Sequence, residues 1–317
     1  MSASGTDESG NEIVSDGLMR EVVYTAGRAA RPHDFQKSRH VKMQDPRDCF
    51  FCPGNEARTP PEITFAKVPG EKAPEGGAES YWSVRCFENK FPAVRKDWKK
   101  AYGYHEVIVE TPRHRLTVSE LSKKHWAAYL GVAAGRLKEH MKDRKIRYSI
   151  LFKNEGREAG ASLEHTHSQL VSLPYVPARI REYAKTHAKI IRRAAGNKKT
   201  IVSSNRSFFA FCPDTSQFHF EAWIAPKKAG TGSLLDLGRD EIEDLADIMQ
   251  KTLASLDAIT SYSPYNIVYI MAPKGARGFT MSIRIMPRLA TWAGFELGCG
   301  SVMNSVHPET AAKMLRQ

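Results

Sequence analysis

Two stretches of this 317-residue chain repeat one order of elements, and this repeat limits the possible folds more than any other feature. In the first stretch, the alternating segment "HEVIVETP" (105–112) predicts a strand, and "YSILFKNEG" (148–156) and "LEHTHSQLVSLP" (163–174) predict two more. Ser119 can cap a helix between the first two strands. Its apolar residues recur at helical spacing: Trp126, Leu130, Ala133, Leu137 and Met141.

The same order returns in the second stretch. Strands are predicted at "FEAWIAP" (220–226), "NIVYIMAPKG" (266–275) and "TMSIRIMP" (280–287). The helix after the first of them has apolar residues Ile242, Leu245, Met249, Leu253 and Leu256. A strand, a helix and two further strands in each stretch favour an α+β fold of two duplicated halves, with an antiparallel sheet and helices packed on one face.

The repeat also sets the expected domain boundaries. Residues 1–18 are polar and aperiodic, which predicts a disordered acidic tail, and the first half then covers 19–178. The basic run at 179–199 predicts a helical connector to the second half at 200–317. That run is typical either of a nucleic-acid stripe or of a solvated helix face, and we favour the solvated face because no aromatic stacking platform accompanies it.

Composition narrows the partners and the compartment. The formal charge of +12 favours an acidic partner, which charge alone leaves open among nucleic acid, a membrane surface and a phosphorylated small molecule. The chain start lacks a basic n-region, and no run approaches the ~18 apolar residues of a membrane span, so we expect a cytoplasmic enzyme. Five cysteines do not suit a secreted disulfide framework, so reduced thiols or metal ligands are expected.

Three chemically useful side chains alternate in the stretch 163–174. His165, His167 and Gln169 project to one face of the predicted strand, because successive side chains on a strand point to opposite faces. An imidazole can bind a metal or attack phosphorus, and an amide can donate to a phosphoryl oxygen. The pattern therefore favours phosphate chemistry on this face.

Two other segments add phosphate-binding features. In "NEGREAGASL" (154–163), Gly156 and Gly160 allow backbone N–H groups to approach an anion, and Ser162 adds a hydroxyl, although a plain glycine-rich turn is the alternative interpretation. In "GRAARP" (27–32), Arg28 and Arg31 could each bind a phosphate through two hydrogen bonds.

A cysteine pair suggests a metal site. Cys49 and Cys52 have the spacing that lets two thiolates bind one tetrahedral zinc ion. A redox pair would normally open a helix, but Pro53 and Gly54 follow here. Zinc is favoured, while a redox pair and two buried thiols remain open, and histidines must supply the other ligands.

Several quoted segments, in their order along the chain, resemble galactose-1-phosphate uridylyltransferase and its relatives in the transferase branch of the histidine-triad superfamily. They lie between about residues 22 and 316: "RAARP", "CFFCPGNEARTPPE", "RCFENKFPAV", "HEVIVETPRH", "NEGREAGASLEHTHSQ", "FEAWIAPKK" and "GFELGCG…HPETAAKMLR". The resemblance implies two histidine-triad-like halves, of which the first is catalytic and carries zinc and the second is degenerate.

The resemblance also implies roles for individual residues. His167 matches the histidine that attacks the α-phosphorus of a nucleoside diphosphosugar, and Gln169 matches a glutamine that binds the nucleotidyl phosphate. The implied zinc ligands are Cys49, Cys52, His114 and His165. The implied substrate contacts are Arg28, Arg31, Asn89, Asn154, Ser162 and Glu296.

The chain departs from the family pattern in ways that affect specificity. Thr166 stands where proline is common between the two histidines, a variation associated with ADP-glucose phosphorylase, and Val302 stands where some members have a sugar-binding glutamine. A second metal site is expected to be absent, because its positions match Ile270, Ser282 and Arg284.

Three functions follow from these features. The first is a galactose-1-phosphate uridylyltransferase-like enzyme that exchanges a nucleoside monophosphate between a nucleoside diphosphosugar and a sugar 1-phosphate through a nucleotidyl-histidine. The second keeps this chemistry but uses inorganic phosphate as the acceptor, with ADP-glucose or a dinucleoside polyphosphate as the donor. The third is a zinc-containing nucleic-acid-binding protein without turnover, which we favour least. The resemblance further implies a homodimer and no membrane partner.

Overall fold

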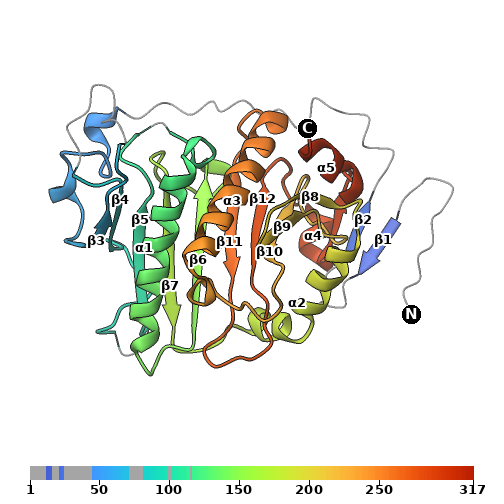
Figure 1. Ribbon diagram of the computed structural model, residues 1–317, viewed down its shortest axis with the longest axis horizontal. Coiled ribbons are helices and arrows are strands. Elements are labelled where there is room, and N and C mark those ends of the chain that lie inside the picture. Colours follow the sequence, from blue (N-terminus) through green and yellow to red (C-terminus); the bar gives the residue numbers. More distant parts are fainter. Residues whose placement is uncertain (1–11, 16–20, 25–44, 71–80, 99–100, 115) are drawn as a thin grey trace.

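The computed structural model describes residues 12–15, 21–24, 45–70, 81–98, 101–114 and 116–317 (Figure 1). The strands are β1 (Glu12–Ser15), β2 (Glu21–Tyr24), β3 (Glu62–Ala66), β4 (Val84–Glu88), β5 (Tyr104–Val109), β6 (Tyr148–Glu155), β7 (His167–Leu173), β8 (Ile201–Ser204), β9 (Phe208–Phe211), β10 (Ala222–Pro226), β11 (Tyr265–Ile270), β12 (Ser282–Pro287) and β13 (Ser301–Asn304). The α-helices are α1 (Lys123–Lys142), α2 (Ala178–Gly196), α3 (Arg239–Thr260), α4 (Gly294–Cys299) and α5 (Pro308–Leu315).

One ten-stranded sheet holds both halves of the chain. Its order is β3-β4-β5-β7-β6-β11-β12-β10-β9-β8, and every neighbouring pair is antiparallel. The halves meet at the β6–β11 pair, and outward from it each half repeats the same sequence of strands. β12 therefore occupies in the second half the place of β7 in the first, and the predicted α+β fold with a duplicated antiparallel sheet is confirmed.

The main core lies between the sheet and the helices α1 and α3, which run side by side across one face (Figure 1). Trp126 and Leu130 of α1 and Leu253 of α3 are at most 1% exposed and belong to this core. They pack against strand residues such as Leu170 and Ile283. The helical spacing of the apolar residues is thus explained by burial against a common sheet.

Helix α2 lies on the opposite face of the sheet, over the second half. Ile180 and Tyr183 pack against β-sheet residues such as Ile270, on the face that points away from α1 and α3. Basic residues of α2, including Arg181 and Arg192, are exposed. The helical connector thus has a solvated basic face and a buried apolar one. Helices were expected on one face of the sheet, but α2 covers part of the opposite face as well.

A small separate sheet joins the two ends of the described chain. β1 pairs antiparallel with β2, and β2 pairs parallel with β13. Within the stretch expected to be a disordered tail, residues 12–15 form β1, and the rest of that stretch lies outside the described residues. No helix in the described part of the chain is long and apolar enough to cross a membrane.

Candidate functional site

Strand β7 presents two sets of side chains to two environments. Leu170 belongs to the core beneath α1, and the Ser168 hydroxyl accepts a hydrogen bond of 2.9 Å from Tyr129 of that helix. His167 and Gln169 therefore project to the other face of the sheet, as the alternation predicts. His165 precedes the strand and is fully buried.

The contacts of His167 leave one ring nitrogen available for chemistry. Its Nδ1 lies 2.9 Å from the backbone oxygen of His165, and because a carbonyl can only accept, Nδ1 carries the proton and donates. Burial lowers the pKa of His167, and the charge of nearby Lys153 lowers it further. The neutral ring thus has an unprotonated Nε2, the form that a nucleophile requires.

A buried ionic network lies behind this strand. The Lys153 ammonium is 2.8 Å from Glu110 and 3.1 Å from Glu155, and Thr166 donates to Glu110 over 2.8 Å. Burial alone would lower the pKa of Lys153, but the two carboxylates outweigh it and raise that pKa. Lys153 also donates to the His167 backbone oxygen over 3.3 Å. Thr166 joins this network through its hydroxyl, which a proline at this position would lack. The network itself was not expected from the sequence.

Gln169 is held by two residues from the neighbouring strand and its loop. His105 of β5 places Nε2 at 2.7 Å from the Gln169 side-chain oxygen, and Asn89 places its amide nitrogen at 3.3 Å from the same oxygen. Asn89 was expected to contact substrate, whereas no role was expected for His105. The available signal was the position of His105 at the start of "HEVIVETP", on a strand that pairs with β7.

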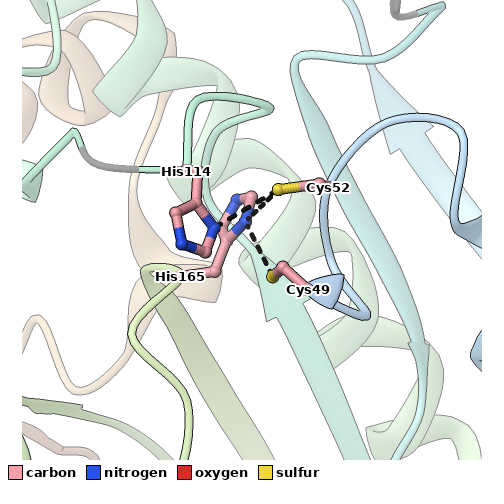
Figure 2. Close-up of side chains that lie close together, drawn as sticks. All are labelled: Cys49, Cys52, His114 and His165. Atoms are coloured by element: carbon pink, nitrogen blue, oxygen red, sulfur yellow. Dashed lines mark hydrogen bonds between the residues drawn. The ribbon is translucent and has the colours of Figure 1, made fainter. Parts of the chain in front are cut away.

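Four predicted metal ligands converge although they come from three distant segments (Figure 2). Sγ of Cys52 lies 3.3 Å from Nδ1 of His114, and Nδ1 of His165 lies 3.5 Å from Sγ of Cys52 and 3.6 Å from Sγ of Cys49. A tetrahedral zinc with ordinary bond lengths would separate sulfur and nitrogen ligands by about 3.6 Å. The four residues therefore fit a tetrahedral ion bound by two thiolates and two imidazoles.

Surrounding groups orient these ligands toward one another. Nε2 of His165 lies 2.7 Å from the Thr111 backbone oxygen, so this nitrogen donates and Nδ1 faces the sulfurs. The hydrogen bond between the two thiols lowers the pKa of Cys49 and raises that of Cys52, so Cys49 is the thiol of the pair that ionises first. All four ligands are buried. Because the backbone oxygen of His165 is the acceptor for His167, the cluster also supports the His167 ring.

The remaining predicted contacts lie in several places. Asn154 accepts a 2.8 Å hydrogen bond from Asn266, at the junction of β6 and β11. Ser162 is exposed on the loop before β7. Glu296 lies on α4, which contacts β13, and its carboxylate accepts hydrogen bonds from the backbone N–H groups of Ala293 and Met303. Arg28 and Arg31, also expected to bind phosphate, lie outside the described residues.

The equivalent face of the second half is filled by side chains. Arg284 of β12 places its guanidinium 4.3 Å from the ring centroid of Tyr183 and 3.9 Å from that of Trp223. His187 of α2 makes a 2.9 Å hydrogen bond to the Ser282 hydroxyl. Ser282 and Arg284, on the strand that takes the place of β7, are therefore packed beneath α2, in keeping with a structural second half.

Two family models match the chain. One is described as "Galactose-1-phosphate uridyl transferase, N-terminal domain" and matches residues 6–177. The other is described as a domain of unknown function (DUF4921) and matches residues 103–317. The first covers more than half of the chain and contains both the cluster of two cysteines and two histidines and β7.

Curated relatives and solved structures point the same way. ADP-glucose phosphorylase of Arabidopsis thaliana is 27% identical over 94% of this chain and 90% of its own length, and a Thermotoga maritima galactose-1-phosphate uridylyltransferase is 25% identical over 76% and 87%. The crystal structure of the Arabidopsis thaliana ADP-glucose phosphorylase with bound ADP-glucose superposes with a TM-score of 0.81, at 25% identity, over 97% of this chain and 98% of that one. With the family match, the duplicated sheet and the histidine strand, these similarities establish that the chain belongs to the galactose-1-phosphate uridylyltransferase family.

Proposed function

We propose that the protein is a nucleotidyltransferase that forms a covalent nucleotidyl adduct on His167. The observation that carries this proposal is the hydrogen bond from Nδ1 of His167 to the His165 backbone oxygen, which leaves Nε2 as the free nucleophile. The neutral amide of Gln169 on the same face could stabilise the transferring phosphoryl group but cannot protonate a leaving group. This combination favours transfer over hydrolysis.

The proposed reaction takes two steps. Nε2 of His167 attacks the α-phosphorus of a nucleoside diphosphosugar, a phosphorus–nitrogen bond forms, and the bond to the bridging oxygen breaks to release a sugar 1-phosphate. An acceptor phosphate oxygen then attacks the same phosphorus, and the bond to His167 breaks. The free histidine returns together with a nucleoside diphosphate or a new nucleoside diphosphosugar, depending on the acceptor.

Inorganic phosphate with ADP-glucose is the pair of substrates that the comparisons support best. The ADP-glucose phosphorylase similarity extends over nearly the whole chain in both sequence and structure. The position of Thr166 between the two histidines agrees with it. The products would be glucose 1-phosphate and ADP.

Uridylyl transfer between sugar phosphates is the second candidate. It is supported by the match of residues 6–177 to the uridyl transferase family model and by the Thermotoga maritima relative. Both candidates use the same adduct chemistry, so they differ only in the base carried and in the acceptor.

We further propose that Cys49, Cys52, His114 and His165 hold a zinc ion. Two thiols and two imidazoles are ligands that zinc prefers in a tetrahedral site. Since four protein ligands complete that coordination, the ion would stabilise the loop that carries Cys49 and the start of β7 and would not bind substrate.

We also propose a homodimer in which Glu296 serves the site of the partner subunit. The family resemblance makes Glu296 a sugar contact. Its helix α4, however, contacts β13 of the small separate sheet and lies toward the opposite side of the molecule from β7 (Figure 1). In a homodimer, Glu296 of one chain would lie at the His167 site of the other chain.

Intact-protein mass measured after mixing with ADP-glucose, UDP-glucose or UDP-galactose tests the proposed chemistry. We expect an added AMP or UMP with one donor, absent in His167→Ala and unchanged in His219→Ala. His219 is a suitable control because it lies in the second half, hydrogen-bonded to Ser305. Mixing the isolated adduct with phosphate or with galactose 1-phosphate then identifies the acceptor. An adduct that persists in His167→Ala would refute the proposal.

A further inference from the structure

The side-chain amide of Gln169 is held in one orientation by residues outside β7. The first is His105, which lies on β5 and on the same sheet face as Gln169, diagonally across the pair formed by Val107 and Gln169. It is half-buried beside a cleft of about 490 Å³, whose lining also includes Asn89.

The protonation of the His105 ring follows from its backbone contact. The Ala93 backbone N–H points at Nδ1 of His105 over 2.9 Å, and because an N–H can only donate, Nδ1 must be the acceptor. In the neutral ring the proton is then on Nε2. This nitrogen lies 2.7 Å from the Gln169 side-chain oxygen and therefore donates to it. Burial lowers the pKa of His105, which agrees with a neutral ring.

The orientation of Asn89 leads to the same result. Its side-chain oxygen accepts a 2.8 Å hydrogen bond from the Phe91 backbone N–H, so its amide nitrogen points the other way. That nitrogen lies 3.3 Å from the Gln169 oxygen and 3.1 Å from Nε2 of His105. Because Nε2 carries a proton and cannot accept, the Asn89 amide donates to the Gln169 oxygen. His105 and Asn89 thus direct two donors at one acceptor, and the amide assignment of Gln169 is determined by its neighbours.

Fixing the oxygen of Gln169 also fixes its NH₂ group. If the Gln169 amide were rotated by half a turn, its oxygen would take the place of the NH₂. The NH₂ group, itself a donor, would then lie against the donors of His105 and Asn89. In the fixed orientation, the NH₂ is the branch left for a ligand, and a phosphoryl oxygen, which only accepts, can bind it. The flipped amide would repel the same oxygen.

We propose that His105, assisted by Asn89, is a positioning residue that holds the Gln169 amide with its NH₂ toward the phosphoryl group during nucleotidyl transfer to His167. The inference rests on the proposed function, because it assigns the amide to that reaction. His105 acts through Gln169 and does not itself touch the reacting atoms.

The test uses single-turnover release of glucose 1-phosphate from ADP-glucose, or the corresponding release from the donor that forms the adduct. His105→Phe keeps a ring but loses the donor, and we expect the rate constant for adduct formation to fall by about 10-fold to 100-fold, with donor affinity little changed. His105→Gln can place an amide nitrogen near the position of Nε2, and we expect it to restore most of the rate.

A double-mutant cycle separates positioning from a general structural role. Gln169→Ala should slow adduct formation by about 100-fold to 1,000-fold, and adding His105→Phe should slow it no further. Asn89→Ala is a milder second variant, to be used if His105→Phe does not fold. It should slow adduct formation when Gln169 is present and have no effect on the rate constant in the Gln169→Ala background. Circular dichroism and bound metal content check folding in each variant.

The outcomes separate the inference from the proposed function. Equal slowing by His105→Phe with and without Gln169, or no rescue by His105→Gln, would overturn the positioning role while leaving the His167 adduct intact. No adduct in the wild-type protein, or an adduct that survives His167→Ala, would instead overturn the proposed function and the positioning role with it.

Discussion

At the residue scale, the proposed reactivity of His167 depends on two contacts of His165. The His165 ring contributes Nδ1 to the cluster with Cys49, Cys52 and His114, and its backbone oxygen accepts the hydrogen bond from His167 Nδ1. The neighbouring Phe51 ring, between the two cysteines of the cluster, has its centroid 5.2 Å from that of His167. The metal cluster and the proposed nucleophile are therefore one packed unit, and disturbing the first should disturb the second.

Removing one of the proposed zinc ligands tests this unit. Cys52→Ser should reduce bound zinc from about one ion per chain and lower the melting temperature by more than about 5 °C, because the ligands are buried and tie three distant segments together. Metal analysis and thermal unfolding provide the measurements. Cys299→Ser is the matched control, since Cys299 is an exposed cysteine outside the cluster and should change neither quantity. Equal metal content in both variants would exclude the proposed ligand set.

At the element scale, the turn after β6 depends on a glycine. Gly156 has φ of 80°, and a Cβ built there would lie 2.8 Å from the Pro264 side chain. We expect Gly156→Ala to lower the free energy of unfolding by about 1–3 kcal/mol, measured in urea.

Gly131 provides the control for that substitution. It lies in α1, is exposed, and a Cβ there would meet no atom within 4 Å. Gly131→Ala should therefore leave stability unchanged or raise it by up to about 1 kcal/mol. If the two variants unfolded at the same urea concentration, the strain at Gly156 would not matter.

The attachment of α1 to β5 should depend on pH. Glu106 of β5 is 2% exposed, and its carboxylate lies 2.8 Å from His140 and 2.7 Å from Arg136, both on α1. Burial would raise the pKa of Glu106, but these hydrogen bonds outweigh it and lower the pKa from 4.5 to about 2. The stabilisation is therefore complete above pH 4.5 and is lost as the pH falls toward 2.

Urea unfolding between pH 7 and pH 2 measures this contribution. The shift corresponds to about 3 kcal/mol, which the wild-type protein should lose across that interval in addition to its general acid destabilisation. Glu106→Gln should already be less stable at pH 7 and should lack this part of the pH dependence. Parallel stability curves for the two proteins would contradict the assignment.

At the scale of the whole molecule, duplication has produced two unequal halves. The face that carries His167 in the first half is covered in the second by α2, where Arg284 packs between Tyr183 and Trp223. A continuous sheet joins the halves through β6 and β11, so the second half supports the strand that carries Asn154. One active face per chain is the expected result.

The proposed homodimer is the prediction that belongs to this scale. Sedimentation velocity should give a mass of twice 35.5 kDa at micromolar concentration. Mixing His167→Ala with Glu296→Ala chains should restore activity, because hybrid dimers contain one site with both residues intact. A monomer, or no recovery on mixing, would show that Glu296 does not serve a partner's site.

The sequence alone determined what depends on local periodicity and on element order. The alternation at 165–169 assigned His167 and Gln169 to one face, because side chains on a strand alternate whatever the strand packs against. The repeated order of strands and helices predicted the antiparallel duplicated sheet for a similar reason. The metal ligands followed from the family resemblance, and the spacing of Cys49 and Cys52 supported two of them.

The tertiary structure decided what depends on the register between distant strands. It brought Cys49 and Cys52 within 4 Å of His165, across more than a hundred residues of chain. It brought His105 within hydrogen-bond distance of Gln169, buried Lys153 beside β7 and placed α2 on the opposite face of the sheet. No local pattern encodes these contacts, because each arises only after two strands have paired and a third element has packed on them.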